Sequence, residues 1–488
     1  MERSQGGSAQ LVRVLGFWAT AALVIGSVIG SGIFKKPALM AGQLGSPEWL
    51  VAAWVIAGAL TLAGALTNAE IAGMISETGG QYVFFEKMYG KFVAYLYGWA
   101  VFAVIQTGSI ASITWVFSEY SQFFFPLPRL SPETEASVVL HLPFIGDIQP
   151  LAHFGVKLLT MAVIAGLTTV NYLGVRFGGS VQVLFTSLKV AAILVLVTAS
   201  LLFFDGSAQN FTQDAAAAPA AGGGFLLALV AALSGAFWAY DGWNNITYVA
   251  GEVREPQKTI PRALLVGTLV VIAVYVLVNL AYLWVLPVEG MAASQLVASD
   301  VARRVLGPMG GAFVAAAVMV STFGTSNGTI LASARCHFAL ARAGRFFPSV
   351  GGVHPRFQTP GTSLAWQAAW ACVLVVTGTF DTLTDTLIFV SWVFYALGAA
   401  GVFVLRRRMP DAPRPYRVPL YPWLPGVFVL VATAFVAITL ANDVAAYVRG
   451  ETPFVTSVFG LALVAAGVPL YAFFGARSRA LRSEVPHL

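Results

Sequence analysis

The segment Gly26 to Phe34 reads GSVIGSGIF and lies in the middle of an otherwise apolar stretch. Its three glycines and two serines interrupt the helix where a membrane-spanning segment is normally most regular. An unpaired backbone N–H or C=O group in hydrocarbon costs several kcal/mol, so such a break persists only where it lines a protein-buried or wet cavity. The segment therefore predicts a broken membrane helix beside a cavity for a small polar solute.

The composition places the chain in a membrane. Of 488 residues, 58% are hydrophobic and only 10% are charged, against about 25% charged in soluble domains. Apolar runs of about 20 residues, the length that crosses a bilayer as a helix, recur along the chain. We expect an all-α protein with twelve spans, at roughly 14–41, 48–75, 91–123, 152–172, 180–204, 223–250, 263–286, 310–340, 362–379, 384–405, 422–441 and 454–474.

Basic residues are distributed by loop. With the N-terminus inside, the segments predicted to face outside hold only Arg129, Lys157, Arg303, Arg304 and Arg449. The positive-inside rule then places both termini in the cytoplasm of a multi-pass protein of the cell membrane, plasma or inner. The net charge of +6 therefore reflects orientation, and we expect the bilayer rather than a nucleic acid as the partner.

A second break falls in the sixth span, at FWAYDGWNN, Phe237 to Asn245. Matching breaks in two halves of a chain are typical of inverted-repeat transporters with a binding site near the membrane midplane. We expect one transporter domain with 5+5 inverted repeats at about 11–204 and 223–406. Spans 11 and 12, within 422–474, are then peripheral.

Four motifs carry a family resemblance. They are GSVIGSGIF followed by Pro37, GGQYVFFE from Gly79, WAYDGWNN with the trailing GEVREPQKTIPRA, and FGTSNG from Phe323. Together they resemble the amino acid–polyamine–organocation superfamily, and within it the L-type amino acid transporter branch. The resemblance covers all twelve spans and implies sodium-independent exchange or uptake of amino acids.

The same resemblance bears on partner chains. Animal members of the branch are bonded to a heavy-chain subunit through a cysteine between the third and fourth spans. This chain has only Cys336 and Cys372, neither of them in a predicted exterior loop. We therefore expect no disulfide-linked heavy chain.

At the first break, the outer half-helix begins with free amide N–H groups at Gly30, Ser31, Gly32 and Ile33. A helix N-terminus offers unsatisfied donors and the positive end of its dipole, which suit a carboxylate. The alternative is that the small residues only permit tight packing, since Gly26 and Gly30 have the small-xxx-small spacing.

At the second break, carbonyl groups around Trp238 to Asp241 end the outer half of the helix, and Val28 adds another from the first break. Carbonyls at a half-helix C-terminus favour a cation, here the α-ammonium of an amino acid. The family resemblance implies that Trp238 covers the substrate from outside and that Asn244 is a polar contact. The alternative for Trp238 is ordinary packing.

Asp241 is a carboxylate in a membrane span, and such a group is functional by default unless it is paired. One hypothesis gives it a cationic side chain or the substrate ammonium as partner. The other hypothesis, which we favour, has it satisfy loose amides in the break.

Lys189 lies well inside the fifth span, about 13 Å along the helix from its cytoplasmic end. By resemblance, its ammonium stands where sodium-coupled relatives hold a sodium ion. Its expected partners are backbone near Gly26 and the hydroxyls of Ser321 or Thr325. Snorkelling to the interface is the alternative, and coupling of its protonation to transport is a further hypothesis.

Other classes of function lack support in the sequence. The five histidines have no metal-ligand spacing, no phosphate-binding glycine loop occurs, and no catalytic constellation is evident. We therefore expect no metal, no cofactor and no enzyme activity. A channel would show a continuous polar stripe, and a sensor would carry a soluble domain. An amine or polyamine antiporter and a proton-coupled amino acid symporter remain as alternatives.

Overall fold

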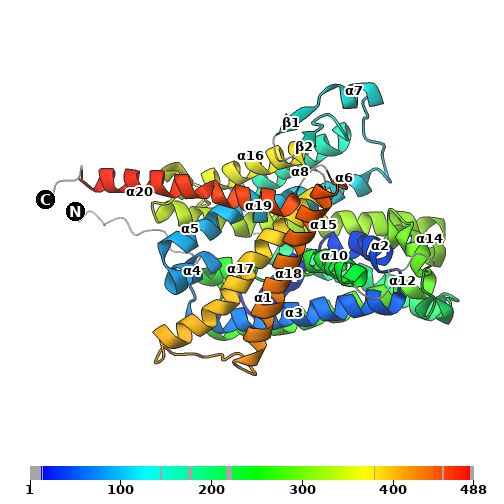
Figure 1. The fold of residues 1–488 in the computed structure, drawn as a ribbon, viewed down its shortest axis with the longest axis horizontal. Helices are drawn as coiled ribbons and strands as arrows, with labels where there is room; N and C mark the ends of the chain where they lie inside the picture. Colours follow the sequence, from blue (N-terminus) through cyan, green and yellow to red (C-terminus); the bar gives the residue numbers. More distant parts are fainter. Residues whose placement is uncertain are drawn as a thin grey trace.

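The protein is a bundle of long helices that run side by side (Figure 1). The computed structural model describes residues 13, 15–77, 79–142, 146–173, 178–215, 223–378, 380–452 and 455–483. Within them, ten helices are long and apolar enough to cross a membrane, and two shorter apolar helices cover Gly224–Tyr240 and Gly361–Thr377. These helices confirm a mainly helical, multi-pass membrane protein.

The first half of the chain contains fifteen elements in order. They are α1 (Phe17–Val28), α2 (Gly32–Leu44), α3 (Pro47–Met74), α4 (Gln81–Tyr89), α5 (Lys91–Ala100), the π-helix η1 (Val101–Ile105), α6 (Gln106–Ser121), α7 (Pro132–Ser137), β1 (Leu140–Leu142), β2 (Gly146–Ile148), α8 (Phe154–Leu173), α9 (Gly178–Thr198), η2 (Ala199–Phe203), η3 (Ala208–Phe211) and α10 (Gly223–Tyr240).

The named elements of the second half are all helices among the described residues. Its elements are α11 (Asn245–Tyr248), η4 (Ala250–Glu252), α12 (Pro256–Val285), α13 (Val288–Ala292), α14 (Val297–Leu306), α15 (Pro308–Arg342), η5 (Pro348–Gly351), α16 (Gly361–Thr377), α17 (Phe380–Arg408), α18 (Trp423–Val448), α19 (Thr456–Ala465) and α20 (Gly467–Ser483).

Each of the twelve predicted spans coincides with helix, and the differences lie in the loops. The segment 287–308 was expected to be loop but contains α13 and α14, because the apolar residues of α14 recur at helical spacing over a length too short to span. The segment 124–150 contains α7 and the antiparallel pair β1–β2, so the chain is not purely helical. The twelve-span topology and the inverted repeats stay predictions.

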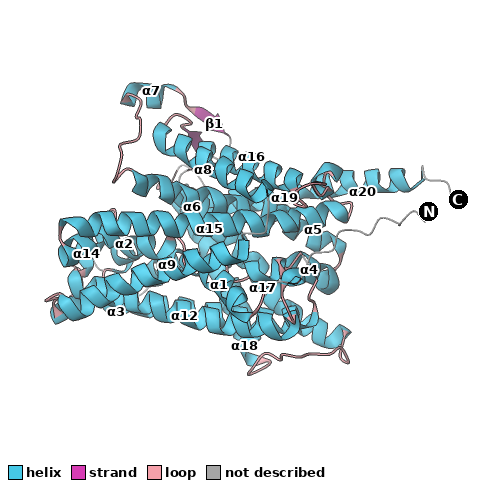
Figure 2. Ribbon diagram, turned by 180° about the vertical axis from the view of Figure 1, so that it is seen from behind, coloured by secondary structure: helices cyan, strands magenta, loops and turns pink. Residues whose placement is uncertain are grey.

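Both predicted interruptions are present. The helix α1 ends at Val28 and α2 begins at Gly32, whereas α10 ends at Tyr240 and α11 begins at Asn245. Gly242 turns the chain at the second break with φ of 102°, a conformation that glycine adopts without strain. Seen from behind, α9, α12 and α15 surround α1, and all three pack against it (Figure 2). The α2 helix packs against α10.

The third long helix contains a π-helical turn, η1, between α5 and α6. Such a turn leaves backbone carbonyls without their usual partners. The hydroxyl of Thr107 donates to Phe102 O at 2.6 Å, and Trp370 Nε1 donates to Ala103 O at 2.9 Å. The disturbed backbone is therefore satisfied before α6 passes the central cavity.

Ion pairs with buried members gather at one end of the bundle, which holds Leu15 and the C-terminal ends of α3 and α17. Leu15 N–H donates to Glu252 O at 3.0 Å, and Arg335 pairs with the Glu252 carboxylate at 2.7 Å. Glu70, which is 1% exposed, accepts from Arg406 at 2.8 Å. We name this the inner end, following the orientation predicted from charge, and the opposite one the outer end.

Substitution of Glu70 tests how much the ion pairs at the inner end contribute to the stability of the protein. Removing one partner of a buried pair leaves an uncompensated charge, so we expect Glu70→Gln to lower the free energy of unfolding by about 3 kcal/mol. Glu77→Gln is the matched control, because the Glu77–Lys87 pair is exposed and exposed pairs contribute about 0–1 kcal/mol. Thermal unfolding in detergent compares the two variants, and equal apparent melting temperatures would contradict this account.

Candidate functional site

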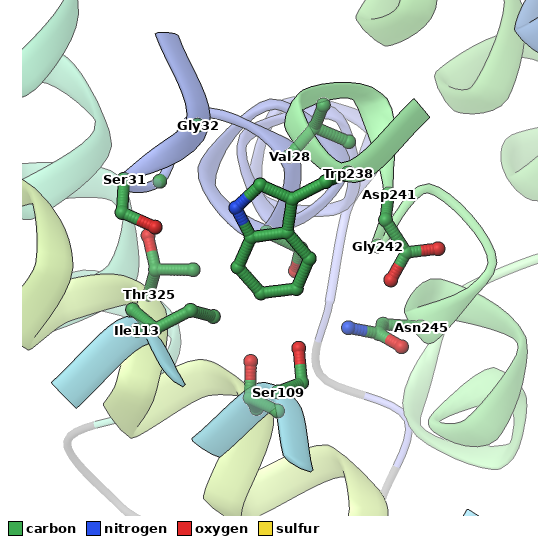
Figure 3. A pocket seen from close by; sticks show the side chains of 13 residues that line it. Val28, Ser31, Gly32, Ser109, Ile113, Trp238, Asp241, Gly242, Asn245 and Thr325 are labelled. Carbon is green, nitrogen blue, oxygen red and sulfur yellow. The ribbon is translucent and has the colours of Figure 1, made fainter. Parts of the chain in front are cut away.

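A small cavity lies where the two interrupted helices meet α6 and α15 (Figure 3). Polar groups and glycines dominate its wall. The lining residues are Ser27, Val28, Gly30, Ser31, Gly32, Ser109, Ile113, Trp238, Asp241, Gly242, Asn245, Thr325 and Thr329. The two breaks, five spans apart in the sequence, therefore open onto one space.

The first break leaves backbone donors free at this cavity. Within the described part of the chain, the N–H groups of Gly30, Ser31, Gly32 and Ile33 have no hydrogen-bond acceptor. The side chain of Ser31 does not cap the helix, and its Oγ is also buried without a partner. These donors stand at the N-terminus of α2, a 13-residue helix whose dipole is positive at this end. The arrangement suits an anionic group with several acceptor oxygens.

Trp238 reaches into the cavity from the end of α10. Its indole lies between Ser31 and Ile113 on one side and Asp241 and Asn245 on the other (Figure 3). The Nε1 atom is buried and has no partner among the described residues. A buried N–H group without an acceptor is unfavourable, so this donor is also available to a bound molecule.

Tyr275 of α12 joins the two breaks. Its hydroxyl lies 3.0 Å from Val28 O and 2.9 Å from Ala239 O, and donates to one of them at a time. These carbonyls belong to the ends of α1 and α10, where helical acceptors are lost. Tyr275 therefore holds the two ends together while each carbonyl keeps a further lone pair.

Lys189 of α9 is 1% exposed, contacts the break between α1 and α2, and does not line the cavity. Its Nζ donates to Gly26 O at 3.0 Å, to Ile29 O at 2.7 Å and to Thr325 Oγ1 at 2.7 Å. Ser321 contributes its backbone carbonyl, at 3.3 Å, rather than the hydroxyl that we expected. One ammonium group thus links α1, α9 and α15. The side chain of Lys189 does not extend to the membrane interface, as the snorkelling alternative would require.

Asp241 lies in the second break at the cavity wall. Its Oδ1 accepts a hydrogen bond from Tyr395 Oη of α17 at 2.5 Å. The ring of Tyr395 packs against Trp243, with centroids 5.3 Å apart. The carboxylate is therefore already engaged by the protein, although it borders the cavity.

Two predicted contacts are absent from the cavity wall. Asn244 is turned away: its amide donates to Gln81 Oε1 at 3.3 Å, and its Oδ1 lies 3.4 Å from Tyr395 Oη. Asn245 lines the cavity instead, because successive residues of a helical turn point about 100° apart. Ile33 is fully buried and does not line the cavity, although its amide has no acceptor among the described residues.

Ser109, Ile113, Asn245 and Thr329 line the cavity without having been predicted. Asn245 also accepts from Gln106 Nε2 at 3.0 Å. A polar residue on one face of an apolar helix gives no sign of whether it faces a cavity or a neighbouring helix. In the described part of the chain, no group of three or more His, Cys, Asp or Glu residues is placed to hold a metal ion.

Comparison with known proteins gives extended similarities. The amino acid permease family profile matches residues 15–468. The serine/threonine exchanger SteT of Bacillus subtilis (strain 168) is 30% identical over 474 residues, which is 96% of this chain and 98% of that protein. The b(0,+)-type amino acid transporter 1 of Mus musculus is 30% identical over 437 residues, 89% of this chain and 84% of that protein. The cystine/glutamate transporter of Homo sapiens is 29% identical over 467 residues, 95% and 86%.

The close approach of α2 to α10 gives a testable prediction. A methyl group at Gly32 would lie 2.4 Å from Ala239 Cα, whereas one at Gly30 would lie 3.4 Å from Thr325 Cγ2. Because overpacking against backbone costs about 1–3 kcal/mol, Gly32→Ala should unfold at a clearly lower temperature than Gly30→Ala. Thermal unfolding of both purified variants measures this, and a Gly32→Ala variant as stable as Gly30→Ala would show that the two half-helices are not closely packed.

Proposed function

Since the chain belongs to the amino acid permease family, and within the amino acid–polyamine–organocation superfamily to the L-type branch, we propose that it exchanges small neutral amino acids across the membrane without sodium. The observation that carries the proposal is the row of unpaired amides at Gly30, Ser31 and Gly32, which lines one cavity together with the carbonyl ends of α1 and α10. An amino acid carries both charges that such a pair of helix ends attracts.

In the proposed complex, the substrate carboxylate accepts hydrogen bonds from the amides of Ser31, Gly32 and Ile33. The α-ammonium donates to backbone carbonyls of Val28 and Trp238. Hydrogen bonds in which one partner is charged are about twice as strong as neutral ones. Because main-chain groups provide this recognition, it applies to any α-amino acid, and the side-chain part of the cavity decides which one binds.

That side-chain part favours a small residue. Ser109, Ile113 and Asn245 surround the indole of Trp238, which occupies much of the space between them (Figure 3). The hydroxyl and amide groups suit serine, threonine or alanine. This substrate class agrees with the name of SteT, the serine/threonine exchanger that is similar over 96% of this chain.

Sodium independence follows, in this proposal, from Lys189. Its ammonium contacts Gly26 O, Ile29 O and Thr325 Oγ1, a set of oxygen ligands of the kind that also binds a small cation. A covalently attached positive charge in this position removes the need for a dissociable one. In this proposal the two inverted repeats of a twelve-span bundle rock about the cavity. The protein lies in the cell membrane with both termini in the cytoplasm, and it works without a heavy chain.

Asp241 separates this proposal from its main competitor. An amine or polyamine antiporter would bind its cationic substrate through this carboxylate. The hydrogen bond from Tyr395 Oη to Asp241 instead supports a role in organising the break, next to the backbone turn at Gly242. We therefore assign Asp241 to the protein framework and give the amino acid carboxylate the main part in recognition.

A transport assay decides between these functions. Proteoliposomes preloaded with unlabelled serine should take up labelled serine, threonine and alanine in sodium-free buffer, and arginine or putrescine much more slowly. Uptake should fall when internal serine is omitted, because exchange requires it. Uptake that depends on sodium, or that prefers putrescine, would contradict the proposal, and uptake driven by a pH gradient without internal substrate would favour the proton-coupled symporter.

Lys189→Ala tests the cation bridge. The substitution removes the charged donor to the carbonyls of Gly26 and Ile29, which then have only the hydroxyls of Thr325 and Ser321 within hydrogen-bond distance, so we expect serine exchange to fall at least about tenfold. Lys91→Ala, at an exposed lysine of the inner end, is the control and should exchange serine normally. Elution as a single species in gel filtration checks folding. Full exchange by Lys189→Ala at every pH would exclude both the bridge and proton coupling through this residue.

A further inference from the structure

Two adjacent lysines lie in α2, between the candidate site and the outer end of the bundle. Lys35 and Lys36 belong to α2, and neither lines the central cavity. Lys36 is 1% exposed and is among the largest fully buried side chains of the protein. A charge buried in a span is unfavourable unless it is paired, and a paired one marks a functional element. The binding site leaves these two charges unexplained.

Lys35 connects α2 to α6. Its Nζ lies 2.5 Å from Glu119 Oε2, while Glu119 Oε1 accepts from Trp115 Nε1 at 3.0 Å. The lysine ammonium also lies 4.4 Å from the ring centroid of Phe380, a cation–π distance. The pair is partly exposed, with 21% and 28% of the two side chains accessible, so it lies at the rim of the closed outer side.

Lys36 connects α2 to α17. Its Nζ lies 3.3 Å from Asp381 Oδ1 and 3.3 Å from Thr384 Oγ1, one helical turn apart. It also lies 5.0 Å from the ring centroid of Phe380. The two lysines therefore reach two different helices and share one aromatic ring between them.

Phe380 links these charges to the binding site. Its ring contacts the indole of Trp238 edge-on, with centroids 6.2 Å apart and planes at 80°. Moving outward from the cavity, one meets Trp238, then Phe380, then the two ion pairs. The aromatic layer closes the cavity sterically, and the charged layer holds α2 against α6 and α17.

The neighbourhood of α2 also leaves room for movement. A second cavity lies between α2, α10, α17 and α18, lined in part by Gln43, Ser234 and Asp385. The outer half-helices α2 and α10 pack closely on one another, as the Ala239 contact of Gly32 shows, whereas the second cavity lies between Gln43 of α2 and Asp385 of α17. The close contact of α2 with α10 would make them move as a unit if the outer side opened.

We propose that Lys35–Glu119 and Lys36–Asp381 form an outer gate, which holds the binding site closed to the exterior and breaks when the site opens outward. Opening returns the ammonium and carboxylate groups to water, and this solvation offsets most of the lost attraction. The gate therefore favours the closed state over the open state by only a small free energy. A transporter requires this, because it must pass through both states. The inference rests on the proposed transport function, but its test does not need the substrate.

The experiment measures access to the cavity from outside. Cys336 and Cys372 are replaced by serine, Ile113→Cys introduces a thiol at the cavity wall, and right-side-out vesicles are treated with a membrane-impermeant methanethiosulfonate reagent. Lys36→Met and Asp381→Asn should each raise the labelling rate about fivefold, the effect of losing one modest ion pair. The charge-exchanged double variant Lys36→Asp with Asp381→Lys should return the rate toward that of the parent.

Lys87→Met and Glu77→Gln, which break an exposed ion pair elsewhere on the protein, are the controls and should leave labelling unchanged. Asp381 is 66% exposed, so Asp381→Asn keeps the test decisive if Lys36→Met fails to fold. Unchanged labelling in the folded single variants, or faster labelling in the double variant than in either single one, would overturn the gate. Absence of amino acid transport in the parent protein would contradict the proposed function alone, because labelling is read without substrate.

Discussion

Backbone polarity in a medium without water is the constraint on which this structure depends. A continuous helix satisfies its own N–H and C=O groups, whereas each break in helices one and six releases several of them. The protein supplies partners for some of these groups and leaves others free. Lys189 and Tyr275 occupy carbonyls of Gly26, Ile29, Val28 and Ala239. The groups that stay unpaired, the amides at the start of α2, face the cavity.

The paired carbonyl groups explain why the breaks are stable even though the protein provides no acceptors for the free amides. Lys189 fixes the first break to α15 through Thr325. Tyr275 fixes both breaks to α12, and Gly32 brings α2 into contact with α10. The unpaired donors are therefore held on a rigid frame, so a ligand can bind them without first ordering the backbone. Preorganisation of this kind suits a site that must recognise a small molecule with few atoms.

The sequence predicts the breaks and Lys189 because their signals are local. Glycines, an aspartate or a lysine inside an apolar span stand out without any knowledge of the fold. The sequence does not reveal which of Asn244 and Asn245 lines the cavity, because the direction of α11 depends on the turn at Gly242. It gave no sign of Tyr275, since tyrosines in membrane helices usually pack against other side chains. The Lys36–Asp381 contact joins residues 345 positions apart, so no local pattern reveals it.

The central claim is that main-chain groups bind both charges of an amino acid. Competition against labelled serine by serine, serine methyl ester and ethanolamine tests it most directly, because the last two lack the carboxylate. Losing charge-assisted hydrogen bonds to the α2 amides should cost about 3 kcal/mol, so both analogues should compete roughly 100-fold more weakly than serine. Ethanolamine that competes as well as serine would contradict the account, since the free amides of the first break would then have no part in recognition.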